Sequence, residues 1–172
     1  MSAFLAFAGT TAAHADMLTV TATGTIGTRC SIAVASPFSS PDLSSSGSVG
    51  ATATVNCNTG FKVNATSANG AIKSATPATT NFTNTLPYDF TLAVPLESGA
   101  PMNATCASSA LVAGQSTCAL SPANGTGLSS SGRASINKTA TLTLAYTVPT
   151  LPTHLIAGSY SDTITLTVAT VP

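Results

Sequence analysis

The sequence predicts an all-β fold, and three observations favour it. Apolar residues alternate with Thr, Ser and Asn in short runs, as they do along strands that bury one face. Gly, Pro, Asn and Ser interrupt these runs at short intervals, as they do at turns. No window of useful length has the spacing of an amphipathic helix. A chain of 172 residues is long enough for one domain with a core of its own.

The first predicted strands lie on either side of the first cysteine. Residues 18–26 alternate, with threonines on one face and small or apolar side chains on the other, namely Leu18, Val20, Ala22, Gly24 and Ile26. A second short strand contains Ile32 and Val34, and a loop rich in Ser and Pro follows it over residues 37–48. The next run, from Val49 to Cys57, turns this cysteine toward the core face.

The rest of the chain continues the pattern. Residues 58–60 read Asn-Thr-Gly, a turn signal, and Phe61 begins the returning strand of a hairpin. An aromatic-bearing strand is predicted at 86–94, residues 97–131 are expected to be irregular, and the last strands are predicted at 140–148 and 158–168. Six or seven short strands with turns between them predict an antiparallel immunoglobulin-like sandwich; a barrel of similar strand count is the alternative.

Charge and composition argue against several functions. Apolar residues make up 44% of the chain, charged residues only 6%, and the formal net charge is zero, which is not the composition of a disordered chain. The five basic residues form no patch that would bind nucleic acid or an anionic membrane. The five acidic residues are dispersed, and His154 has no Cys or acid near it in sequence. We therefore expect that the chain is not an enzyme and that it binds no cofactor and no metal ion.

The N-terminus indicates export. Residues 3–9 form a short apolar run, and Ala13-His14-Ala15 has the small-x-small pattern that signal peptidase recognises, so residues 1–15 are predicted to be a signal peptide. A basic segment before the apolar run is absent, which translation from a start codon further upstream would explain. No other segment approaches the ~20 apolar residues of a membrane span, so direct membrane insertion is not expected.

Four cysteines in an exported chain predict two disulfides. Three connectivities are possible for Cys30, Cys57, Cys106 and Cys118, and sequence order favours Cys30 with Cys57 and Cys106 with Cys118. In the chain-entropy model each bridge contributes about 3 kcal/mol or slightly more. A zinc site is the competing interpretation, but the sequence contains no CxxC pair.

The two ends of the chain suggest a shared strand. The last predicted strand carries Tyr160, Ile164, Leu166 and Val168 on its core face, and the sequence ends four residues after it, so another strand must cover that edge. Residues 18–26 form an alternating strand with no obligatory partner. Strand addition between molecules would satisfy both, with main-chain hydrogen bonds giving affinity and alternate side chains filling the groove. The alternative is a monomeric secreted binding domain, a sugar-binding sandwich or tip adhesin, in which residues 18–26 pair internally.

Four segments resemble the spore coat protein U domain and the archaic chaperone-usher pilins, in family order. They are 20–32 (VTATGTIGTRCSI), 53–61 (ATVNCNTGF), 86–88 (LPY) and 158–168 (GSYSDTITLTV). The resemblance implies an incomplete immunoglobulin-like domain over residues 29–172, a donor strand over 16–28, and a bridge between Cys30 and Cys57. The segment containing Cys106 and Cys118 departs from the family pattern, and so does the loop after Val34.

The same resemblance implies a function and a route. Such a chain is a structural subunit of a surface pilus or coat polymer that supports adhesion and biofilm formation. Its partners would be neighbouring subunits of the fibre, a periplasmic chaperone and an outer-membrane usher, with polymerisation by donor-strand exchange. It would pass through the periplasm to the cell surface. Asp162, which lacks an accompanying base or nucleophile, is expected to accept hydrogen bonds at the start of the last strand.

Overall fold

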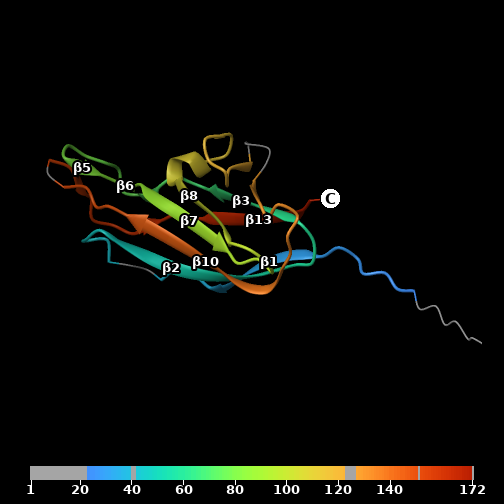
Figure 1. Ribbon diagram of the computed structural model, residues 1–172. Coiled ribbons are helices and arrows are strands. Elements are labelled where there is room, and N and C mark those ends of the chain that lie inside the picture. The colour runs from blue at the N-terminus through green and yellow to red at the C-terminus, as the bar shows by residue number, and fades with distance from the viewer. Residues whose placement is uncertain (1–22, 40–41, 123–126, 151, 172) are drawn as a thin grey trace, which may run out of the picture.

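The computed structural model describes residues 23–39, 42–122, 127–150 and 152–171 of the chain (Figure 1). Within these ranges the protein is all-β, as predicted, with a short 3-10 helix, η1, at Ser108–Leu111. The strands are β1 Cys30–Ser36, β2 Gly47–Cys57, β3 Phe61–Ser67, β4 Ile72–Ser74, β5 Phe82–Thr83, β6 Thr85–Leu86, β7 Tyr88–Val94, β8 Met102–Ala107, β9 Leu128–Ser129, β10 Ser135–Tyr146, β11 His154–Leu155, β12 Tyr160–Ser161 and β13 Ile164–Thr170.

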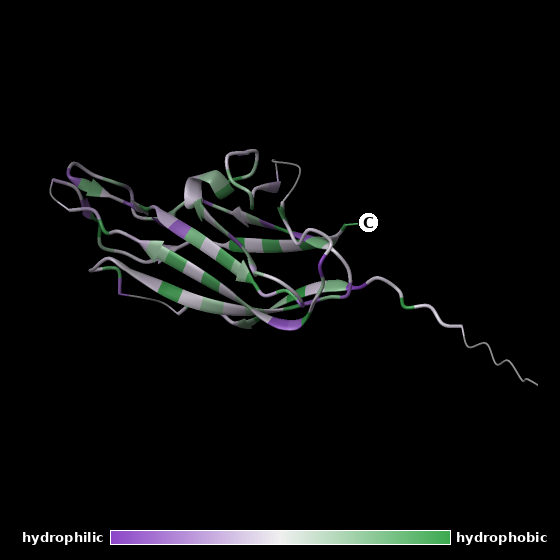
Figure 2. Ribbon diagram, viewed as in Figure 1, coloured by the Kyte–Doolittle hydropathy of each residue, from purple (hydrophilic) through white to green (hydrophobic). Residues whose placement is uncertain are grey.

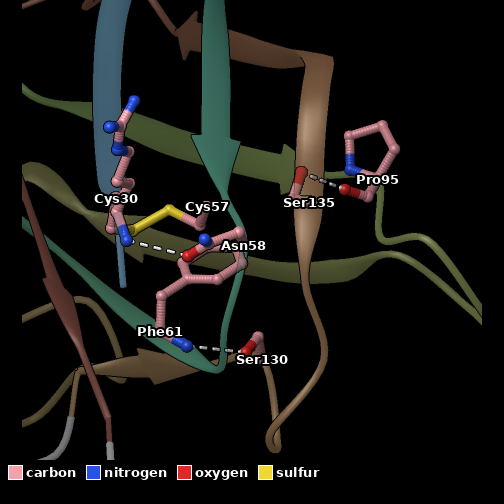
Figure 3. Close-up of a disulfide and its surroundings, with 8 residues drawn as sticks. Cys30, Cys57, Asn58, Phe61, Pro95, Ser130 and Ser135 are labelled. Atoms are coloured by element: carbon pink, nitrogen blue, oxygen red, sulfur yellow. Dashed lines mark hydrogen bonds between the residues drawn. A yellow bond between two sulfur atoms is a disulfide. The ribbon is translucent and has the colours of Figure 1, made fainter. Parts of the chain in front are cut away.

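The largest sheet has five antiparallel strands in the order β1-β2-β10-β7-β8. Strands β2 and β10 form its longest ladder, from Gly47 opposite Tyr146 to Cys57 opposite Ser135. The ladder shifts register between Ser135 and Lys138, next to Asn137 with its positive φ of 51°. At this irregular end the Ser135 hydroxyl donates a hydrogen bond of 2.8 Å to the Pro95 carbonyl (Figure 3).

The remaining strands form three smaller sheets. One is antiparallel in the order β13-β3-β9, with Leu166 opposite Ala65 and Val168 opposite Val63. The predicted hairpin between β2 and β3 is therefore wrong, because the Asn-Thr-Gly turn carries the chain from one sheet to another. Another has the order β12-β4-β6, and the third is the parallel pair β11-β5. The predicted last strand is therefore two strands, β12 and β13, because Asp162 and Thr163 between them are not in strand conformation.

One hydrophobic core joins the five-stranded sheet to the β13-β3-β9 sheet. Alternate side chains of β2, β3 and β7 are buried, as are those of β10 from Ala140 to Tyr146, and the residues between them are polar or small (Figure 2). Phe61 on β3 and Phe90 on β7 are the largest fully buried side chains. Burial of such a side chain stabilises the fold by roughly 1.5–3 kcal/mol. The period of two that predicted the strands is thus the pattern that forms the core.

Both disulfides have the connectivity that sequence order favoured. Cys30 and Cys57 are direct cross-strand neighbours on β1 and β2, with Cα atoms 4.0 Å apart (Figure 3). Cys106 on β8 is bonded to Cys118 in the segment that follows η1, with Cα atoms 5.8 Å apart. The first bridge fixes the start of β1, and the second ties an extended loop to the edge strand of the large sheet.

The segment expected to be irregular, 97–131, contains more structure than predicted. It includes β8, η1 and β9. Three parts of it cover the edge of β3 that faces away from β13: β9 pairs with Lys62 and Val63, the Leu120 carbonyl accepts the Ala65 amide at 2.8 Å, and Val112 bridges to Ser67. The bridge from Cys106 to Cys118 therefore ties down an edge cover for this sheet.

Candidate functional site: an apolar groove between two strand edges

A groove of about 910 Å³ lies between the five-stranded sheet and the β13-β3-β9 sheet. Strand β1 contributes Ile32 and Val34 to its lining, and β13 contributes Ile164 and Leu166. Both strands are edges in the described part of the chain, since β1 pairs only with β2 and β13 only with β3. Their unpaired sides give the groove two strand edges with free main-chain hydrogen-bonding groups.

The β13 wall is a core face that is incompletely covered. Ile164, Leu166 and Val168 share the face of β13 whose cross-strand neighbours on β3 include the fully buried Ala65 and Val63. All three are nevertheless only half-buried. On the opposite wall Val34 is 69% exposed. Apolar side chains on the core-facing sides of β1 and β13 thus remain accessible to solvent.

The floor of the groove comes from strands that the sequence marked only as core. Val49 and Ala51 on β2 and Leu142 and Leu144 on β10 contribute to it. No sequence signal separates these residues from other buried alternating positions, because the opening depends on which strands pair with one another. Of the predicted acceptor residues, Ile164 and Leu166 line the groove from β13, and Tyr160 lines it from β12. Val168 also lies on β13, but it is not among the residues that line the groove.

Asp162 is one of the residues that line the groove, and it accepts four hydrogen bonds. The Ser67 and Tyr88 hydroxyls both donate to its Oδ2, each at 2.6 Å. The amides of Asn69 and Thr163 donate to its Oδ1 at 3.0 and 2.8 Å. This confirms the expected task of Asp162 at the start of the last strand. Burial, followed by the hydrogen bond to Asp162, raises the pKa of Tyr88 above its usual value.

The predicted donor residues are only partly within the described chain. Leu18, Val20 and Ala22 lie outside it. Gly24 and Ile26 lie in the stretch before β1, which forms no strand with the rest of the described protein, and Ile26 is 90% exposed. Figure 1 shows this stretch leaving the body at the start of β1. Internal pairing of residues 18–26, the alternative prediction, does not occur over residues 23–26.

Comparisons with protein-family models, with curated proteins and with solved structures find no significant match. The resemblance to spore coat protein U domains thus stays a prediction.

Other candidate chemistry is sparse in the described ranges. No three His, Cys, Asp or Glu side chains there lie close enough to hold a metal ion. No helix in those ranges is long and apolar enough to cross a membrane. His154 lies on β11 with its ring centroid 6.1 Å from that of Phe82. The apolar groove is therefore the feature that a functional proposal must explain.

Proposed function

We propose that this chain is a structural subunit that polymerises by strand addition. In this proposal residues 18–26, here called the arm, leave one copy and occupy the groove between β1 and β13 of another copy. The single observation that carries it is the incompletely covered core face of β13, whose Ile164 and Leu166 line an apolar groove beside an unpaired strand edge. The body is then an immunoglobulin-like sandwich that lacks one strand.

The chemistry of the arm matches the groove. An added strand would form main-chain hydrogen bonds with the free edge of β13, and its alternate side chains would enter the groove. The arm supplies apolar or small side chains at every second position and carries no charged residue. Burial of such a strand therefore desolvates no charge. Its threonines, at the intervening positions, would face away from the core and tolerate water.

The cellular setting follows from the same proposal. Two disulfides fit an oxidising compartment, and the sequence resemblance adds a periplasmic chaperone, an outer-membrane usher and assembly into a pilus or coat at the cell surface. A free subunit with an open apolar groove is prone to aggregate, so a chaperone that covers the groove before assembly is consistent with this surface. Adhesion and biofilm formation would be properties of the finished polymer.

The arm is tested by Val20→Asp, with Thr21→Asp as the matched control. Val20 is on the face of the arm that would enter the groove, and Thr21 is on the opposite face. We expect the wild-type chain and Thr21→Asp to form ladders that resist detergent until heated, whereas Val20→Asp stays monomeric. The chaperone complex should form with all three chains.

The groove is tested by complementation. Leu166→Asp should block acceptance, and Thr165→Asp, on the exposed face of β13, should not. A mixture of Val20→Asp, which can only accept, and Leu166→Asp, which can only donate, should stop at dimers. Ladders formed by Val20→Asp alone would disprove the arm assignment. A wild-type chain that remains monomeric with its arm protected would instead support the monomeric binding domain.

A further inference from the structure

Polymerisation by strand addition has an intramolecular competitor. The arm is connected to β1 by residues 27–29, so a tight turn there would let it fold back beside β1 and fill its own groove. A strand on a short flexible tether has an effective concentration on the order of 1 mM, about 1,000-fold above a subunit at micromolar concentration. We call the insertion of the arm into its own groove self-closure. What keeps the arm from self-closure is a question that rests on the proposed function.

Asn58 holds the connection between the arm and β1. Its side-chain Oδ1 accepts the Arg29 amide at 2.8 Å, and its Nδ2 donates to the Gly27 carbonyl at 2.9 Å. Its own amide donates to the Arg29 carbonyl at 3.0 Å. One residue thus makes three hydrogen bonds to the main chain just before β1.

These bonds require an extended chain. In an extended segment the carbonyl of one residue and the amide of the second residue after it point to the same side, where a neighbouring strand would bind both. The Asn58 carboxamide takes the place of such a neighbouring strand. It can do so because it offers a donor to the Gly27 carbonyl and an acceptor to the Arg29 amide. It therefore continues β1 in a straight line for three residues. A tight turn over residues 26–29 would break this pattern.

Asn58 is itself well anchored. It follows Cys57, which is bonded to Cys30 across the β1–β2 ladder, and Figure 3 shows its side chain beside that bridge. Three residues later the fully buried Phe61 enters the core, and its amide is bound by the Ser130 hydroxyl at 2.9 Å. Ahead of this anchor, Ile26 is 90% exposed and no atom lies within 4 Å of the position of a Cβ at Gly24 or Gly27.

We infer that Asn58 is a positioning residue that keeps residues 27–29 extended, so that the arm is presented to a second copy and kept out of its own groove.

The test is the concentration dependence of assembly in full-length Asn58→Ala. Self-closure is independent of concentration, whereas assembly between copies is not. We expect Asn58→Ala to need at least tenfold more protein than the wild type before half of the chains are in polymers, with a stable monomer below that point. Asn58→Asp, which keeps the acceptor for Arg29 and loses the donor to Gly27, should be intermediate. Asn56→Ala, an exposed change on β2, is the matched control and should behave as wild type.

A second measurement separates positioning from a general effect on the body. In the Val20→Asp background, whose arm cannot insert, a synthetic peptide of residues 18–26 should enter the groove equally fast with Asn58 and with Asn58→Ala. Slower uptake by Asn58→Ala there, or unchanged assembly in the first test, would overturn the role of Asn58. If the Val20→Asp chain takes up no peptide and the wild type forms no polymer, the proposed function itself fails.

Discussion

Replacing Asp162 by Ala should be among the most destabilising single changes near the groove. The change removes the carboxylate that accepts the Ser67 and Tyr88 hydroxyls, both in partly buried positions. Each hydrogen bond to a charged group contributes roughly 1.5–3 kcal/mol, so losing both costs about 3–6 kcal/mol. Water can reach the amides of Asn69 and Thr163, which lie in exposed positions, and their loss adds little. The expected cost is a large part of the roughly 5–15 kcal/mol that stabilises a typical domain.

Urea unfolding followed by far-UV circular dichroism measures this cost. The Val20→Asp background keeps the protein monomeric, and Asp89→Ala, an exposed position on β7, is the matched control. We expect a lower midpoint with an unchanged slope for Asp162→Ala and no change for the control. Tyr88→Phe should cost less, and its effect should shrink in the Asp162→Ala background because the two side chains share a hydrogen bond. A loss below about 1 kcal/mol for Asp162→Ala would refute the reasoning.

Three further predictions concern stability. The pKa of Tyr88 is raised in the fold, so the contribution of Tyr88 to the free energy of unfolding is fully present below the usual tyrosine pKa of about 10 and is lost at higher pH. In Tyr88→Phe the free energy of unfolding should therefore fall less steeply as the pH rises above that value. Changing Cys106 and Cys118 together to Ala should cost about 3 kcal/mol and speed hydrogen exchange at the Ala65 amide, and unchanged exchange would contradict the edge cover on β3. Phe61→Ala should cost about 3–5 kcal/mol by denaturant unfolding, whereas Phe82→Ala, 43% exposed, should cost far less; equal losses would contradict the burial pattern.

Much of the fold could be predicted because alternation is a local property. A period of two places Phe61 and Val63 on a buried face wherever the strand pairs, so strand positions and core residues followed from the sequence. Cysteine order favoured both disulfides. In the structure Cys30 begins β1 and Cys57 ends β2, which places the two cysteines opposite each other in an antiparallel ladder. Asp162 was identified as a hydrogen-bond acceptor from its place at the start of a strand.

The sequence by itself determined that this protein is built of strands, where most of them lie and which faces they bury. Only the tertiary structure decided that the 158–168 run divides at Asp162, that residues 97–131 cover one edge of β3, and that β1 and β13 leave a groove between them. The physical reason is that a strand edge is open or closed according to which distant segment pairs with it. Pairing between segments far apart in sequence is a property of the whole chain, and a local pattern does not encode it.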